Sequence, residues 1–140
     1  MKVMVLVKAN AESEAGKMPS ERLVSEMMAF NERLVKAGVM LAGEGLQASS
    51  KGKRVRSAKG RITVIDGPFA ETKELLAGFW IWQVGSIEEA VDWARQIPNP
   101  DGQDGEVEIR PMFEAGEVTS DMADELRKKE QRLRAELDRK

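Results

Sequence analysis

The strongest candidate for chemistry is Asp66, an acid that follows an apolar run and precedes a glycine and a proline. The run at 62–65 predicts a strand. Gly67 is able to supply a positive φ, and Pro68 fixes its own φ while disfavouring the helical region for Gly67. A strand that ends in such a stiff turn would hold the carboxylate in one place. A partly desolvated carboxylate beside the apolar ring of Phe69 is suited to general acid–base catalysis, so Asp66 is the candidate catalytic residue.

Four further side chains are candidates for ligand binding around that carboxylate: Glu44, Phe69, Lys73 and Arg110. Glu44 stands between two glycines, a pattern typical of a bulge or a close backbone approach. We expect a cavity at Asp66, bordered by the first helix and by at least one of the three charged candidates. Two alternatives stay open. In the first, Glu44 is only a surface acid beside a structural bulge. In the second, Asp66 caps the backbone N–H groups of 67–70 in an Asx-type turn.

The absence of cysteine and histidine excludes several classes of chemistry. Without cysteine there are no disulfides, thiolate nucleophiles or iron–sulfur clusters. Without histidine the usual neutral-pH base and imidazole metal ligand are missing. The loop at 99–105 holds two aspartates, but their spacing does not fit an EF-hand. We therefore predict neither a metal nor a cofactor.

Length and charge indicate one ordinary globular domain. A chain of 140 residues, 41% hydrophobic and 33% charged, can bury a real core. Its net charge of −2 creates no global field that would recruit nucleic acid or an anionic membrane. No apolar run has the length of a membrane span, and the first residues do not resemble a signal peptide. We expect a cytoplasmic protein that binds neither nucleic acid nor membrane.

One segment is strongly basic. Residues 51–61 carry six basic side chains and no acid, a composition that would suit contact with phosphate. The segment has no aromatic residue to stack on a base, and a turn signal at 58–60 predicts a hairpin. Basic side chains along a hairpin also discourage aggregation through its edges. A hairpin is the favoured interpretation, with binding of a small anion as the alternative.

The order of elements predicts an α+β fold. Strands are expected near 1–7, 39–46, 55, 62–66, 78–84 and 107–112. Helices are expected after Ser20, up to about residue 37, and after the capping box at 86–89. This β-α-β-β-β-α-β order is ferredoxin-like, with an antiparallel sheet and an added hairpin. Right-handed crossovers would place both helices on one face of the sheet.

The strand at 78–84 predicts a homodimer. Trp80, Trp82 and Val84 share one face, and Phe79 and Ile81 share the other. We expect the tryptophan face to lie away from the helices. Left open, it would be a larger apolar patch than soluble monomers usually expose. A second copy of the chain would cover it through a twofold interface.

The last 24 residues differ from the domain predicted at 1–116. Residues 117–140 hold seven acids and seven bases, and Leu126, Leu133 and Leu137 form a narrow stripe at helical spacing. A helix of this kind is marginal by itself in water, so its stripe should pack on something. We expect it to be buried within the dimer, with an external regulatory partner as the alternative.

The sequence as a whole resembles the DGPF subgroup of the YCII-related family. The motif DGPFAETKE at 66–74 carries the resemblance, together with the segments at 1–7, 43–46, 78–80 and 107–111. The resemblance covers about residues 1–113. It implies a ferredoxin-like fold that dimerises through its sheet as a dimeric α/β barrel, with a pocket between sheet and helices. A His-Asp pair suggested for some relatives has no counterpart in a chain without histidine. The functional hypothesis is a protein that binds or transforms a small molecule near Asp66, and the alternative is a non-catalytic dimeric module that uses its C-terminal helix.

Overall fold

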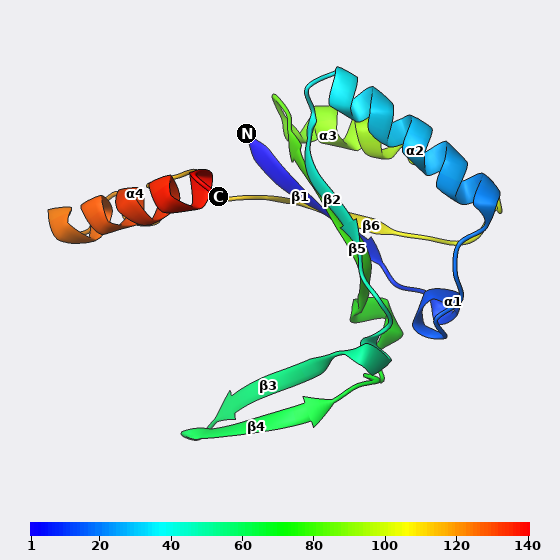
Figure 1. The fold of residues 1–140 in the computed structure, drawn as a ribbon, viewed down its shortest axis with the longest axis horizontal. Coiled ribbons are helices and arrows are strands. Elements are labelled where there is room, and N and C mark those ends of the chain that lie inside the picture. The colour runs from blue at the N-terminus through cyan, green and yellow to red at the C-terminus, as the bar shows by residue number, and fades with distance from the viewer.

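The computed structural model describes residues 1–140 and contains a four-stranded antiparallel sheet (Figure 1). The strand order is β2-β5-β1-β6, and each neighbouring pair is antiparallel. The strands are β1 (Lys2–Lys8), β2 (Met40–Gly45), β5 (Leu76–Gln83) and β6 (Val107–Pro111). The predicted α+β, ferredoxin-like class is confirmed. No helix is long and apolar enough to cross a membrane.

Two helices lie on one side of this sheet, α2 (Glu21–Lys36) and α3 (Ile87–Ala94) (Figure 1). Both begin at the serines that the sequence indicates. Ser20 Oγ accepts the Leu23 N–H at 3.1 Å, and Ser86 Oγ accepts the Glu89 N–H at 3.1 Å. These caps satisfy backbone donors that the first turn leaves without partners. Three short helices complete the body: α1 (Ala11–Glu14), η1 (Ser49–Lys51) and η2 (Thr72–Glu74).

The core lies between these helices and the sheet, and it contains the tryptophans. Phe30 of α2 meets Trp80 edge-on at 5.9 Å between ring centroids and Trp82 at 6.4 Å. The strand register places Val5 beside Trp80 and Val3 beside Trp82, and both valines are fully buried. The prediction that the tryptophan face lies away from the helices is therefore wrong. Both faces of β5 are apolar, so alternation alone does not distinguish the helix side from the open side.

The open face of the sheet carries the other set of alternating residues. Met4 pairs with Ile81 and Leu6 with Phe79, and all four are half-buried. Charged residues flank this stripe at the sheet edges. We call Met4, Leu6, Phe79 and Ile81 the open stripe.

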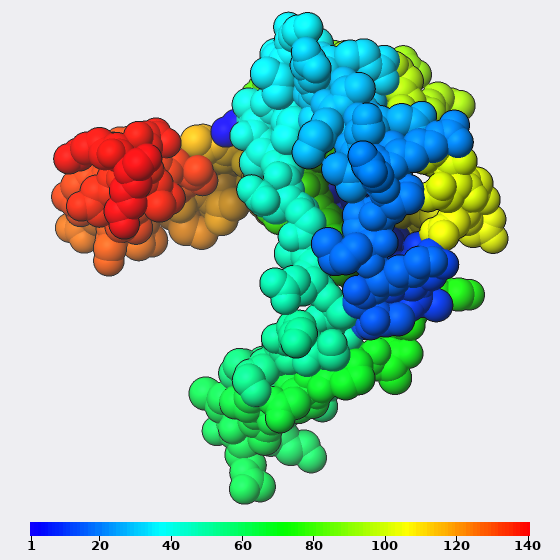
Figure 2. Space-filling view, turned by 45° about the vertical axis from the view of Figure 1, so that its right-hand side comes forward, coloured from blue at the N-terminus to red at the C-terminus, as the bar shows by residue number.

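The strands β3 (Lys53–Ala58) and β4 (Arg61–Asp66) form a separate two-stranded sheet that projects from the body (Figures 1 and 2). The predicted hairpin is confirmed, with its turn at Lys59 (φ 50°) and Gly60 (φ 74°). Positive φ at both turn positions is typical of a tight hairpin connection. We call this hairpin the β3–β4 arm.

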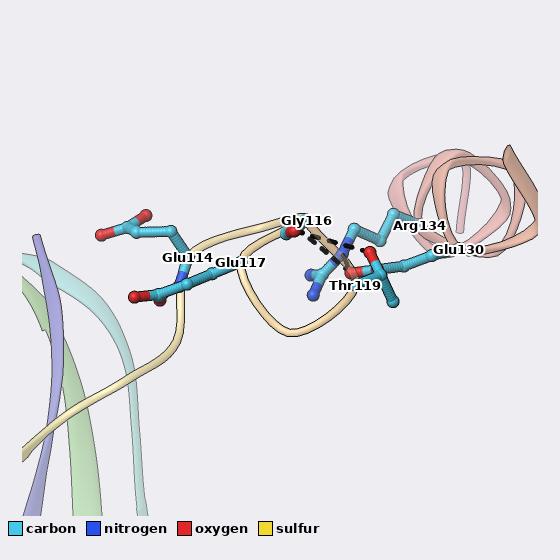
Figure 3. A network of polar contacts seen from close by, with 6 residues as sticks. All are labelled: Glu114, Gly116, Glu117, Thr119, Glu130 and Arg134. Carbon is cyan, nitrogen blue, oxygen red and sulfur yellow. Dashed lines mark hydrogen bonds and ion pairs between the residues drawn. The ribbon is translucent and has the colours of Figure 1, made fainter. Parts of the chain in front are cut away.

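The C-terminal helix α4 (Asp124–Asp138) also extends away from the body (Figure 1). Its main polar anchor is Glu130, whose carboxylate accepts hydrogen bonds from Thr119 Oγ1 at 2.6 Å, Arg134 Nε at 3.1 Å and the Gly116 N–H at 3.2 Å (Figure 3). This network joins α4 to the preceding loop rather than to the sheet. The leucine stripe of α4 is exposed in the single chain, and its burial in an assembly stays a prediction.

Candidate functional site

The loop after β4 is fixed by a small polar cluster around Ser49. The Phe69 N–H donates to Ser49 Oγ at 3.1 Å. Ser49 in turn donates to the Glu14 carboxylate twice, from its hydroxyl at 2.5 Å and from its backbone N–H at 2.9 Å. We call residues 67–75, between β4 and β5, the motif loop. Ser49 belongs to η1, Glu14 to α1 and Phe69 to the motif loop, so these three bonds hold together segments that are far apart in the sequence.

Gly67 makes the close approach of this loop to η1 possible. A Cβ at Gly67 would lie 1.8 Å from the Ser49 carbonyl oxygen, and the Gly67 N–H donates to the Gly52 carbonyl at 3.0 Å. Gly67 is not among the residues with positive φ. Glycine is required at position 67, but not for a positive φ. It is required because the backbone of Ser49 passes where a side chain would lie.

A groove of about 590 Å³ lies at the root of the β3–β4 arm. Its volume is within the range of small-molecule sites, roughly 300–1,000 Å³. Part of its wall is apolar and comes from Leu46, Leu75, Leu76 and the Phe69 ring. Two bases and one acid also line it, namely Lys51, Arg54 and Glu74.

Arg54 is the most distinctive group in this groove. Its guanidinium carbon lies 3.9 Å from the centroid of the Phe69 ring, which is a close cation–π contact. No carboxylate forms an ion pair with Arg54 or Lys51 anywhere in the chain. Stacking occupies the flat face of the guanidinium and leaves its N–H edge able to bind a carboxylate or a phosphate through two hydrogen bonds.

Asp66, the predicted catalytic residue, is the last residue of β4 and lies where the same loop begins. Its side chain is 75% exposed and forms an ion pair with Lys53 on the neighbouring strand. It is not among the residues that line the groove, and no residue of α2 lines the groove either. The Asx-turn alternative is also not realised, since Lys53 is the hydrogen-bond partner of the carboxylate. β4 belongs to the projecting arm and not to the main sheet that α2 covers.

The remaining predicted ligand residues are divided between two regions. Phe69 lines the groove, and Lys73 lies in η2 on the exposed side of the same loop. Glu44 is on edge strand β2 opposite Phe79, whereas Arg110 is on β6 at the other edge opposite Met4. The structure therefore brings Glu44 and Arg110 to opposite ends of the open stripe and not to Asp66.

Charge at the β6 edge is balanced locally. Arg110 Nη1 lies 3.2 Å from Glu108 Oε2, and Lys8 Nζ lies 3.5 Å from Glu108 Oε1. The hydrogen bond from Arg110 and the charge of Lys8 lower the pKa of Glu108 below its ordinary value. Arg110 is thus already paired, which makes it a weaker ligand candidate than Arg54.

Sequence reasoning missed Glu14 and Ser49, and it treated Arg54 only as part of a basic run. Ser49 lies in a single turn of 3-10 helix that no periodicity announces. Glu14 lies in a segment whose polar composition is typical of a loop, but the Asn10 capping box starts α1 there. That capping pattern, an Asn followed three residues later by Ser13, is the one signal that would have placed a helix there.

Comparison with known proteins now defines the family. The model of the YCII-related domain matches residues 1–115. The chain belongs to this family. An uncharacterized protein of Rhizobium meliloti (strain 1021) is 35% identical over 106 residues, which cover 74% of this chain and 86% of that relative. The groove, the motif loop and both edges of the sheet lie inside the YCII-related domain, whereas α4 follows it.

Proposed function

We propose that this YCII-related protein binds a small organic anion in the groove at the root of the β3–β4 arm. The observation that carries the proposal is Arg54 stacked on Phe69 at the groove with no carboxylate partner. A carboxylate or phosphate group would bind to the guanidinium edge, and Lys51 would add a second positive charge.

The other walls narrow the class of ligand. Leu46, Leu75 and Leu76 offer an apolar surface that would cover a short hydrocarbon or aromatic portion. Glu74 on the same groove would repel a second anionic group but would accept a hydrogen bond from a hydroxyl or an amine. The ligand that fits this chemistry is a monoanion with an apolar part.

Binding is better supported than transformation. Asp66, the candidate base, contacts Lys53 and lies outside the groove in the single chain. Glu74 lines the groove but forms no ion pair with Arg54, and no other acid lines it. Asp66 becomes a catalytic candidate only if a second chain encloses it.

A homodimer formed through the open stripe is part of the same proposal. Met4, Leu6, Phe79 and Ile81 make a continuous apolar strip across the two central strands, with no helix over it (Figure 1). A second copy would cover this strip through a self-complementary contact. The alternative function, an interaction module that works through α4, is favoured by one observation: its leucines are more than half exposed.

An NMR titration tests the binding proposal. Benzoate serves as the aromatic monoanion and benzamide as its neutral analogue, added to the ¹⁵N-labelled full chain. We expect benzoate to shift the amide signals of Phe69 and of residues 51–54, and benzamide to leave them in place.

Two variants make this experiment specific. Arg54→Met removes the charge and keeps much of the side-chain length, and it should weaken benzoate binding by about tenfold or more, since hydrogen bonds to charged groups contribute roughly 1.5–3 kcal/mol. Arg56→Met is the matched control, because Arg56 lies two residues further along the same face of the arm. Equal shifts with benzamide, or unchanged binding in Arg54→Met, would refute the proposal.

A further inference from the structure

A single chain exposes far more surface than a compact monomer of the same mass. The accessible surface is 10578 Å² for 15.6 kDa. A compact monomer of that mass would expose about 7,200 Å², which leaves an excess of roughly 3,300 Å². Figure 2 shows the source of this excess: the β3–β4 arm and α4 stand away from the body, with a wide opening between them.

The β3–β4 arm has two chemically different faces. Strand alternation and register put Val55, Ile62 and Val64 on one face, and they are 70%, 73% and 62% exposed. The opposite face carries Arg54, Arg56 and Arg61. An isolated two-stranded hairpin is marginally stable at best in water, and a hydrophobic face of this kind needs a cover. No part of the same chain provides that cover.

Charge favours a second copy as the cover. Residues 51–61 carry a charge of +6, and the whole chain carries −2, so the other residues carry −8. The arm of one chain is therefore attracted to the body of another, whereas two arms repel each other.

The amount of exposed surface also indicates that a second copy of the chain covers the arm. A standard interface buries about 800 Å² of each partner, which is much less than the excess found here. Large interfaces of this size are typical of obligate, intertwined dimers, in which elements cross from one subunit to the other. A flat contact through the open stripe alone would leave both faces of the arm in water.

We propose that the β3–β4 arm is exchanged between two copies of the chain, with Val55, Ile62 and Val64 packed on the partner subunit. The inference rests on the proposed homodimer and adds its second contact. It also has a consequence for the groove: Arg54 and Phe69 lie at the root of the arm, so the partner subunit borders the groove and completes its outer wall.

Two neighbouring substitutions test the exchange by sedimentation velocity at micromolar concentration. Ile62→Lys places a charge on the apolar face, and Thr63→Lys places the same charge on the opposite face of the same strand. Both positions are exposed in a single chain, so neither substitution disturbs the core. We expect Ile62→Lys to raise the dimer dissociation constant by at least about 30-fold, as for a residue central to an interface, and Thr63→Lys to change it little.

The outcomes separate this inference from the homodimer itself. A wild-type chain that sediments as a monomer would overturn both. A wild-type dimer that Ile62→Lys leaves as tight as before would overturn only the exchange of the arm and retain the contact through the open stripe. Circular dichroism of each variant checks that the fold is intact.

Cross-linking gives an independent measurement. The chain has no cysteine, so Ser57→Cys, on the apolar face of the arm, creates a unique site for a benzophenone maleimide. Equal amounts of light chain carrying the benzophenone and ¹⁵N chain without it are unfolded together, refolded, irradiated and analysed by mass spectrometry. Cross-links between light and heavy peptides are expected, and cross-links found only within the light chain would contradict the exchange.

A basic arm also raises the possibility of a nucleic-acid partner, which a mobility-shift assay with duplex DNA distinguishes. We expect no complex at about 150 mM salt, because the chain as a whole is acidic. A salt-dependent complex formed by a monomeric protein would overturn the proposal in favour of nucleic acid.

Discussion

The indole Nε1–H of Trp80 donates a hydrogen bond to Asn31 Oδ1 at 2.9 Å, across the contact between β5 and α2. This bond gives a polar partner to a ring that is otherwise buried among apolar side chains. The nearby Trp82 Nε1 is buried without such a partner. This hydrogen bond therefore helps to position α2 on the sheet, in addition to apolar packing.

The Asn31 contact leads to a prediction about stability. Asn31→Ala should lower the free energy of unfolding by about 1–2 kcal/mol, because it leaves a buried donor without an acceptor. Urea denaturation followed by circular dichroism measures the change. Glu32→Ala, at the next and exposed position of the same helix, is the control and should have little effect. Equal losses in both variants would show that the hydrogen bond has no special role.

Gly67→Ala should disturb the motif loop. The added Cβ would meet the Ser49 carbonyl oxygen, a backbone atom that is unable to rotate away. We expect a loss of about 1–3 kcal/mol in the free energy of unfolding, as for other substitutions that overpack a close contact. The backbone signals of Ser49 and Phe69 should shift in NMR spectra. Gly105→Ala is the control because nothing lies near its Cβ position, and a loss as large as that of Gly67→Ala would contradict the explanation.

Acid should loosen α4 through Glu130. Hydrogen bonds from Thr119, Arg134 and the Gly116 N–H hold the pKa of this carboxyl below its ordinary value of 4.5. A carboxyl whose pKa is lower in the folded state than in the unfolded state stabilises the fold at pH values above its unfolded pKa. This contribution is lost as the pH falls through the folded pKa. The contact between α4 and residues 114–120 should therefore weaken below about pH 4.5.

Carbon-detected NMR of the Glu130 carboxyl measures this titration directly. Thr119→Val removes the hydrogen bond that contributes most, so the pKa of Glu130 should move up toward its ordinary value. Ser120→Ala is the control, since that hydroxyl bonds to the Glu117 carbonyl and not to Glu130. An unchanged titration in Thr119→Val would show that the network of Figure 3 does not persist in solution.

A charge on the open stripe should weaken the proposed homodimer. Ile81→Lys introduces an ammonium group into the apolar strip opposite Met4, and burying it without a partner is strongly unfavourable. Sedimentation equilibrium should show an increase of at least about 30-fold in the dissociation constant. Val35→Lys, at an exposed apolar position of α2, is the matched control. A dimer that both variants leave intact would place the interface elsewhere.

Removal of residues 117–140 tests the C-terminal helix. We expect the truncated chain to dimerise more weakly or to melt at a lower temperature, because the leucine stripe of α4 should pack within the dimer. Calorimetry and sedimentation measure the two effects. If the shortened protein matches the full chain in both, α4 serves an external partner instead, as in the alternative function.

Much of the fold could be predicted because it depends on local signals. Ser20 and Ser86 begin their helices as expected, and the turn at Lys59 and Gly60 closes the hairpin. The orientation of β5 could not be predicted in this way, because apolar residues occupy both of its faces. Phe30 and Leu34 of a distant helix decide which face is buried, and a strand's own alternation holds no information about them.

The site was only partly predictable for a similar reason. The motif loop and Phe69 stand out in the sequence, but the groove depends on contacts among three separate segments. Ser49 bonds to Glu14 across 35 positions and to Phe69 across 20. Nothing in the type or spacing of these residues indicates that they meet. Glycine at 67 was expected for its conformational freedom, whereas the structure requires it for its size.

The placement of the tryptophans has a practical consequence for anyone who studies this protein by its intrinsic fluorescence. Trp80 and Trp82 are buried on the helix side of the sheet, and Trp93 packs against the same cluster 6.5 Å from Phe30. Their emission therefore reports whether the layers of one chain are together, and it should stay constant while two chains separate. A red shift would mark unfolding, so tryptophan emission reports the loss of the fold, and the loss of the assembly has to be followed by another method.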